Sequence, residues 1–173
     1  ESLQIFAAQL TAKFSARSSG EPEDQLKSPV DQLFNAYGKI ISCPIILKGE
    51  STLHSRLGRP DFAAHSKKLP VGYIELKAPG KGANPELFKG HDREQFKRFK
   101  NVTNLIYTDG NEWALYRSGE LVPKIIRLTG DIRIDGKKAV SEDNAKDLFQ
   151  LLADFTAWVP IVPTKPKELT AFL

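Results

Sequence analysis

Cysteine and methionine are scarce in this chain of 173 residues, which contains one Cys and no Met. A single cysteine, Cys43, excludes an internal disulfide and is typical of the reducing cytoplasm, where we expect the protein to act. The isoleucines on both sides of Cys43 predict a small core residue. Nothing near it in the sequence indicates a catalytic thiol.

Long apolar runs and His/Cys metal motifs are also absent. No stretch reaches the roughly 18 apolar residues that a membrane span needs, and there is no secretory signal, so we expect no membrane partner. The three histidines, His54, His65 and His91, lack the spacing of metal ligands, and no CxxC pair exists. Metal sites built from His and Cys are therefore disfavoured.

Charge, by contrast, is abundant and unevenly distributed. Charged residues make up 27% of the chain and hydrophobic residues 40%, which suits one globular domain with a core. The net charge is +4, and residues 48–100 hold twelve Lys and Arg against six Asp and Glu. Such a basic excess is expected of a phosphate-binding surface, although an ordinary solvated face would also produce it.

We expect residues 1–173 to form a single domain taken from a larger multidomain protein. The chain begins with Glu1 rather than Met, and residues 160–173 are rich in Pro and Lys. That composition is typical of a linker between domains.

The order of the expected elements predicts an α/β fold with a central mixed β-sheet flanked by helices. Apolar spacing predicts helices over residues 3–14, 22–38, 91–100 and 142–158. Strands are expected over residues 40–48, 59–64, 71–77, 104–108, 113–117 and 122–128. A further strand pair is expected within residues 131–140. Gly38 is the expected C-cap of the second helix, Pro29 is expected to break or kink it, and Asp109-Gly110-Asn111 predicts a hairpin.

The stretch GRPDFAAHSKKLPVGYIELKAPG, residues 58–80, places charged residues at the edges of apolar strands. Glu75 and Lys77 are two positions apart, so they point to the same face of a strand. Asp61 belongs to the preceding strand, and the short polar connection predicts that the two strands are antiparallel neighbours. Asp61, Glu75 and Lys77 are therefore expected to converge on one point.

Two carboxylates at close range repel each other unless a cation lies between them. Mg²⁺ prefers oxygen ligands and keeps several waters, one of which becomes a nucleophile when the metal lowers its pKa. A nearby lysine orients that water and stabilises charge on a reacting phosphate. The three residues thus predict phosphodiester hydrolysis. The alternative is that Glu75 and Lys77 form only a surface ion pair on an edge strand.

The segment RPDF…GYIELKAPG resembles the core motif of the PD-(D/E)xK nuclease superfamily, with Asp61, Glu75 and Lys77 at its three positions. The segment DREQFKRFKN resembles the Q-x-x-x-Y element of the restriction-enzyme and RecB-like branches, with Gln95 matching and Phe99 in place of the tyrosine. The segment NLIYTDGNEWALYRSGE is similar to a strand pair in nuclease domains fused to adenine-specific DNA methyltransferases.

This resemblance implies a restriction-endonuclease-like core and a magnesium-dependent DNA endonuclease, with Mn²⁺ as a substitute, in a restriction-modification or related defence enzyme. It implies partners as well: DNA, methyltransferase and ATPase motor domains of a parent enzyme, and a transient dimer of nuclease domains. We expect Asp61, Glu75 and the backbone carbonyl of Leu76 to bind the metal.

In such folds an acidic residue on an early helix assists the metal, and we expect Glu23 here, ahead of Asp24 and Asp31. Gln95 is expected to support the site. A further group is expected to contact the DNA backbone: Arg59, Lys81, Arg93, Lys97 and Arg98.

Other interpretations remain open at this point. The glycine-rich residues 78–90 either approach phosphate with their backbone amides or form a flexible loop, and they lack the Gly-Lys-Ser/Thr ending of a P-loop. The same fold also serves as a DNA- or partner-binding module without cleavage. An RNA-directed nuclease is a third possibility, because the metal chemistry does not distinguish ribose from deoxyribose.

Overall fold

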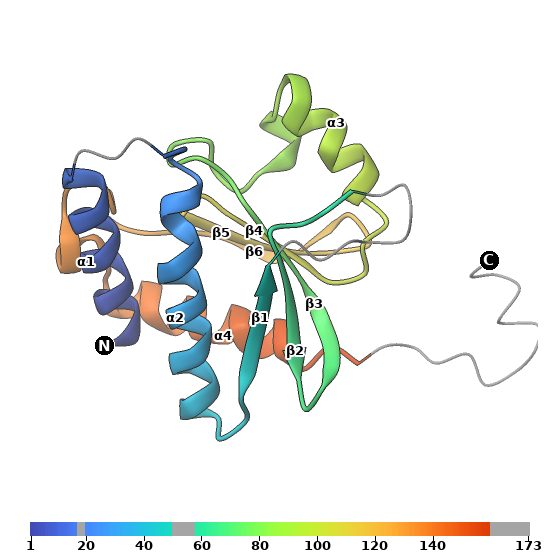
Figure 1. The fold of residues 1–173 in the computed structure, drawn as a ribbon, viewed down its shortest axis with the longest axis horizontal. Helices are drawn as coiled ribbons and strands as arrows, with labels where there is room; N and C mark the ends of the chain where they lie inside the picture. The colour runs from blue at the N-terminus through green and yellow to red at the C-terminus, as the bar shows by residue number, and fades with distance from the viewer. Residues whose placement is uncertain (17–19, 50–57, 160–173) are drawn as a thin grey trace, which may run out of the picture.

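The computed structural model describes residues 1–16, 20–49 and 58–159, and this part of the chain has an α/β fold (Figure 1). A six-stranded mixed sheet is flanked by helices, as the sequence predicted. The α-helices are α1 (Ser2–Ser15), α2 (Asp24–Ile40), α3 (Gly90–Phe99) and α4 (Glu142–Thr156), and two 3₁₀ helices are η1 (Pro85–Leu87) and η2 (Gly136–Ala139). Residues 160–173 and His54 lie outside the described residues.

The strands follow one another across the sheet in chain order. They are β1 (Ile45–Gly49), β2 (Phe62–Ser66), β3 (Leu69–Leu76), β4 (Leu105–Thr108), β5 (Glu112–Arg117) and β6 (Glu120–Arg127). Neighbouring strands are antiparallel except β3 and β4, which are parallel and are connected through α3. A parallel pair needs such a crossover, whereas hairpins join the antiparallel pairs β2–β3, β4–β5 and β5–β6.

Two turns explain how the antiparallel hairpins form. Lys67 and Lys68 join β2 to β3 with φ angles of 49° and 69°, the left-handed conformation of primed hairpin turns. Gly110, with φ of 89°, lies in the turn between β4 and β5 that Asp109-Gly110-Asn111 predicted. Both turns therefore fix the register of the strands beside the charged residues.

The sheet has a separate apolar core on each face. Helices α1, α2 and α4 pack against one face, where Ile74, Leu76 and Ile106 are buried (Figure 1). The segment containing η1 and α3 covers the opposite face, where Tyr107 and Phe99 are buried. Because side chains alternate along a strand, Glu75 and Lys77 point to the α3 side of the sheet.

Several local predictions were wrong at the second helix and the first strand. Helix α2 runs through Pro29 without a break and continues past Gly38 to Ile40, so β1 begins only at Ile45. Gly38 is not a C-cap but a point of close approach, because a Cβ atom there would lie 2.8 Å from the Ile45 backbone nitrogen. Burial of the apolar face of α2 outweighs the cost of a proline in its second turn.

Cys43 is half-buried rather than part of the core. Its Sγ lies 3.1 Å from Ser66 Oγ. No helix in the ranges 1–16, 20–49 and 58–159 is long and apolar enough to cross a membrane.

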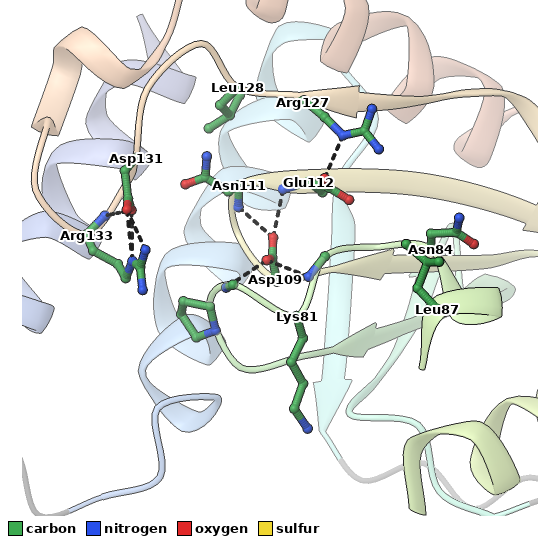
Figure 2. Close-up of a pocket in the computed structure, with 13 residues that line it drawn as sticks. Lys81, Asn84, Leu87, Asp109, Asn111, Glu112, Arg127, Leu128, Asp131 and Arg133 are labelled. Atoms are coloured by element: carbon green, nitrogen blue, oxygen red, sulfur yellow. Dashed lines mark hydrogen bonds and ion pairs between the residues drawn. The ribbon is translucent and has the colours of Figure 1, made fainter. Parts of the chain in front are cut away.

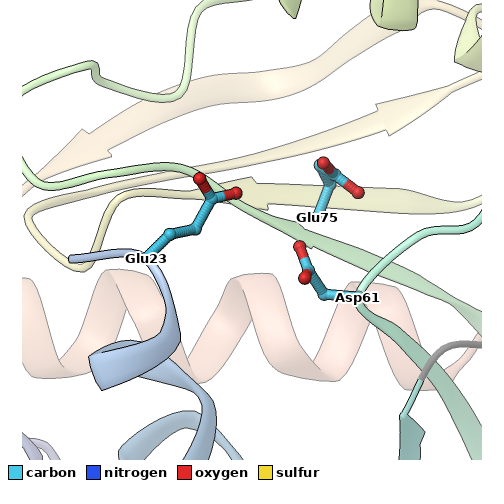
Figure 3. Close-up of side chains that lie close together, drawn as sticks. All are labelled: Glu23, Asp61 and Glu75. Carbon is cyan, nitrogen blue, oxygen red and sulfur yellow. The ribbon is translucent and has the colours of Figure 1, made fainter. Parts of the chain in front are cut away.

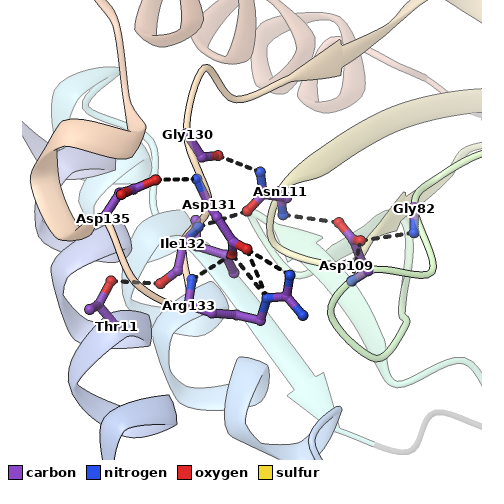
Figure 4. A network of polar contacts seen from close by, with 10 residues as sticks. Thr11, Gly82, Asp109, Asn111, Gly130, Asp131, Ile132, Arg133 and Asp135 are labelled. Atoms are coloured by element: carbon purple, nitrogen blue, oxygen red, sulfur yellow. Dashed lines mark hydrogen bonds and ion pairs between the residues drawn. The ribbon is translucent and has the colours of Figure 1, made fainter.

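The expected strand pair in residues 131–140 is also absent, and η2 lies there instead. Side chains bind the backbone groups that a strand would have used (Figure 4). Asp131 N donates to Asp135 Oδ2 at 2.7 Å, Ile132 N to Asn111 Oδ1 at 2.8 Å, and Gly136 N to Thr11 Oγ1 at 2.9 Å. Side chains of this kind compete with sheet pairing, which the apolar alternation alone does not reveal.

Candidate active site

Three carboxylates from distant parts of the sequence converge where β2 begins and β3 ends. Glu23 lies at the N-terminus of α2, Asp61 precedes β2, and Glu75 lies near the end of β3 (Figure 3). Each offers one oxygen, and these oxygens all lie within 4.8 Å of one another. The structure thus brings together the two carboxylates of the motif and the early acidic residue preferred from the sequence.

Strand pairing explains the proximity of Asp61 and Glu75. Phe62 pairs with Ile74 in the antiparallel register of β2 and β3, so the residues that follow outward from this pair are Asp61 and Glu75. Asp61 Oδ2 also accepts a hydrogen bond from Leu76 N at 2.8 Å. This bond fixes the orientation of the Asp61 carboxylate relative to β3.

Lys77 lies against the carboxylates and is surrounded by oxygen atoms. Its Nζ lies 2.9 Å from Glu75 Oε1, 2.8 Å from Gln95 Oε1 and 3.2 Å from Asp92 Oδ1. Glu23 Oε1 is 3.9 Å away. Gln95 therefore contacts the lysine of the motif directly.

Glu75 and Lys77 do not form a surface pair. Only 3% of Glu75 and 2% of Lys77 is exposed, and the strand that carries them lies inside the sheet. Burying an ion pair costs hydration that mutual attraction seldom repays in full, so such a pair is weak support for a purely stabilising role. The surface-pair interpretation of the sequence is wrong.

Burial changes the proton affinity of the cluster. It raises the pKa of Glu75 to about 7, against the opposing charge of Lys77, and nearby Asp61 adds to the rise. Burial likewise raises the pKa of Asp61 and of Glu23. Burial acts to lower the pKa of Lys77, but the hydrogen bond and charge of Glu75 together with the charges of Glu23 and Asp92 outweigh it, so the pKa is raised and the ammonium remains protonated at neutral pH.

The cluster has the chemistry of a site for a hard divalent cation. Its donors are all carboxylate oxygens, which Mg²⁺ and Mn²⁺ accept as ligands. Within the described part of the chain, the buried Oε2 atom of Glu75 has no hydrogen-bond partner. A cation between the three carboxylates would give that oxygen a partner and remove their repulsion.

Asp92 belongs to the site although the sequence analysis did not select it. It lies on α3 three residues before Gln95, and it contacts both Lys77 and Lys81, whose Nζ lies 2.5 Å from Asp92 Oδ2. Burial acts to raise the pKa of Asp92, but the hydrogen bonds and charges of the two lysines lower it. The helical spacing of Asp92 and Gln95 is a signal that would have identified both on one helix face.

The residues expected to contact DNA lie outside the carboxylate cluster. Arg93, Lys97 and Arg98 lie exposed on α3, and Arg59 is exposed just before Asp61. Lys97 pairs with Glu94 at 2.7 Å, and Arg93 donates to the Glu86 carbonyl at 3.3 Å. Of the five, Lys81 is the residue that is linked to the site. It pairs with Asp92, which also pairs with Lys77 beside the cluster.

Carboxylates occupy three backbone amides of the glycine-rich loop, so these amides are not open to phosphate. Asp109 Oδ2 accepts hydrogen bonds from Gly80 N at 2.9 Å and Gly82 N at 2.8 Å, and Glu112 Oε2 accepts one from Ala83 N at 3.0 Å. The loop is therefore held in place rather than free.

A polar cavity of about 410 Å³ lies beside this loop (Figure 2). It is lined by residues of the loop, the β4–β5 turn and the segment after β6. Among the residues expected to act at the site, only Lys81 lines it.

Comparison with known proteins extends the description of the fold. No family model matches the chain, and no curated protein matches it. A solved structure of a DrdV–DNA complex, determined by cryo-electron microscopy, matches with a TM-score of 0.56 and 20% sequence identity. The match covers 92% of this chain but only 14% of that chain, so the shared fold is a small part of a much larger protein.

Proposed function

We propose that this chain is a magnesium-dependent DNA endonuclease domain of the PD-(D/E)xK superfamily. The observation that supports it most strongly is the cluster of Glu23, Asp61 and Glu75 beside the buried ammonium of Lys77. The arrangement combines oxygen ligands for a hard cation with a cation for a reacting phosphate. The likeness to a protein solved in complex with DNA favours DNA as the substrate.

Each residue of the site has a distinct task in this proposal. Asp61, Glu75 and the Leu76 carbonyl would hold Mg²⁺, or Mn²⁺ in its place, with Glu23 as a further ligand. A metal ion bound there would supply an activated water and neutralise charge on the phosphate. Lys77 orients that water and stabilises charge as it develops on the phosphate. Gln95 keeps the Lys77 ammonium in place through the 2.8 Å hydrogen bond.

The basic residues around the site bind the DNA backbone. Arg59 and Lys81 flank the motif, while Arg93, Lys97 and Arg98 present charge from α3. Phosphate contacts position a protein on DNA without reading its sequence. The chain alone should therefore bind DNA weakly, with strong salt dependence, and cleave slowly with little sequence preference.

Residues 1–173 are proposed to form one domain of a larger cytoplasmic restriction-modification or defence enzyme. The match to only 14% of the DrdV chain supports a setting of this kind. Methyltransferase and ATPase motor domains would then choose and deliver the target. A transient dimer of nuclease domains would allow both strands of a duplex to be cut, since the described residues of one domain form one carboxylate cluster that could hold a metal.

Cleavage of supercoiled plasmids of unrelated sequence at low salt provides the test. Relaxed plasmid should accumulate with Mg²⁺ or Mn²⁺ and not with a chelator, and Glu75→Gln should abolish it. Asp147→Asn is the matched control, because it removes a carboxylate from an exposed pair with Lys124 far from the motif. DNA binding without metal-dependent cleavage would contradict the proposal and favour a binding module, and cleavage of RNA alone would contradict DNA as the substrate.

A further inference from the structure

We propose that Asp92 is a positioning residue that holds two ammonium groups, those of Lys77 and Lys81, at the site where the DNA phosphate reacts. The inference rests on the proposed nuclease function and adds a residue and a second cation to it. Asp92 Oδ1 lies 3.2 Å from Lys77 Nζ, and Asp92 Oδ2 lies 2.5 Å from Lys81 Nζ. One carboxylate thus joins a buried lysine of the motif to a lysine of the following loop.

The orientation of Lys77 depends on α3. An ammonium group has three N–H donors, and three oxygens lie within 3.2 Å of Lys77 Nζ: those of Glu75, Gln95 and Asp92. Gln95 and Asp92 both come from α3, whereas Glu75 belongs to the carboxylate cluster. Helix α3 therefore orients the ammonium through a hydrogen bond to Gln95 and an ion pair with Asp92, while another N–H points to Glu75 in the cluster.

Lys81 is anchored at its backbone and accessible at its ammonium. The N–H groups of Gly80 and Gly82, on either side of Lys81, both donate to Asp109 Oδ2. Asp109 is 2% exposed and accepts two further backbone N–H groups, from Asn111 and Glu112. The Lys81 side chain is 47% exposed, so a DNA phosphate has access to the ammonium that Asp92 holds.

The Lys81 ammonium can bind a phosphate while Asp92 still holds it. It has three N–H donors, and a phosphate oxygen is a charged hydrogen-bond acceptor like the carboxylate oxygen of Asp92. The Lys77 ammonium would remain held by Gln95 and by the other oxygen of Asp92. The reacting phosphate would then meet two fixed cations instead of one, and preorganised charge of this kind lowers the barrier to phosphoryl transfer.

Kinetics separate positioning from binding. Asp92→Asn should lower kcat by about 10- to 100-fold and leave KM within about threefold, because removing one directly acting donor costs about 100- to 1000-fold. Asp92→Glu should restore most of kcat. Lys81→Met should weaken binding of a short labelled duplex in chelator and reduce the slope of log Kd against log salt by about one.

A readout that needs neither metal nor cleavage keeps the two proposals distinct. The ammonium of Lys77, assigned by its loss in Lys77→Met, should give a slowly exchanging ¹H–¹⁵N signal that shifts or broadens in Asp92→Asn and stays in the control Asp147→Asn. Melting temperatures establish that each variant is folded. An unchanged Lys77 signal, or a kcat within twofold of wild type, would overturn the role of Asp92.

Failure of wild-type cleavage has a separate meaning. If the wild type does not cleave DNA, yet Asp92→Asn shifts the Lys77 signal and Lys81→Met reduces the salt slope, the nuclease function is wrong while the two-lysine phosphate site stands. If Lys81→Met leaves both the affinity and the salt slope unchanged, Lys81 is not a phosphate contact and the inference is wrong.

Discussion

Lys77 Nζ lies 2.9 Å from Glu75 Oε1, and both side chains are almost completely buried. They point to the same face of β3 because they are two positions apart. The pair lies beside two further carboxylates, Glu23 and Asp61, so the lysine alone does not balance the local negative charge. Changing this excess of negative charge, or the contacts that hold the site in place, should therefore alter metal binding, cleavage and stability.

Asp61→Asn should lower the affinity for Mg²⁺ and Mn²⁺ at least tenfold. The substitution removes one of three converging charges but keeps an oxygen that accepts the Leu76 N–H. Titration calorimetry measures the change. Asp24→Asn is the control, because Asp24 is exposed beside Glu23 and lies outside the cluster. Equal divalent-ion affinity in wild type and Asp61→Asn would show that no metal binds between these carboxylates.

Lys77→Met should abolish cleavage and lower the free energy of unfolding at pH 8 by about 1–3 kcal/mol, because Glu75 then loses its buried partner. Adding Glu75→Gln should recover part of that stability but no activity. Chemical denaturation followed by circular dichroism measures the stability, and cleavage is assayed where the variant is folded. Undiminished cleavage by Lys77→Met would reduce the lysine to a structural partner of Glu75.

The metal-free protein should become more stable as the pH falls from about 8 to about 5. The pKa of Glu75 is about 7 in the folded protein and 4.5 as the reference value, so the folded state binds the proton more tightly. The stabilisation is complete when the pH lies below the pKa of Glu75 in the unfolded chain, and it is lost as the pH rises through about 7, the pKa of Glu75 in the folded protein. The rise in pKa from 4.5 to about 7 corresponds to about 3 kcal/mol.

Urea denaturation at several pH values in chelator measures this dependence. Glu75→Gln should flatten it, since the amide does not titrate. Stability that rises from pH 5 to pH 8 in the wild type, or the same pH dependence in Glu75→Gln, would contradict the assignment to Glu75.

Asp109→Ala should free the loop after the motif and destabilise the protein by about 2–4 kcal/mol, because four backbone N–H groups lose their acceptor. Hydrogen exchange should show lost protection at Gly80, Gly82, Asn111 and Glu112. Asp131→Ala, which breaks an exposed pair with Arg133, is the control. Retained protection at Gly80 and Gly82 would show that Asp109 does not hold the loop.

Some features required knowledge of contacts between distant segments. The alternation in DIRIDGKKAV predicted strands, but Asn111 and Thr11 from distant segments, together with Asp135 inside the segment, bind its backbone groups and η2 forms instead. The sequence left open whether the amides of the glycine-rich loop contact phosphate or the loop is flexible, whereas in the structure Asp109 binds two of these amides from 29 and 27 positions away. Side-chain acceptors of this kind have no periodic signature in the sequence.

Short-range rules were enough to predict from the sequence that Asp61, Glu75 and Lys77 converge. Side-chain alternation put Glu75 and Lys77 on one face, and a short hairpin set Asp61 beside Glu75; both rules act over a few residues. Glu23 was expected at the site from the family resemblance alone, and the contact of Asp92 with both Lys77 and Lys81 was not expected at all; the folded structure brings these residues into place. Those contacts depend on where α2 and α3 pack against the sheet, which burial of whole apolar faces determines and local pattern does not.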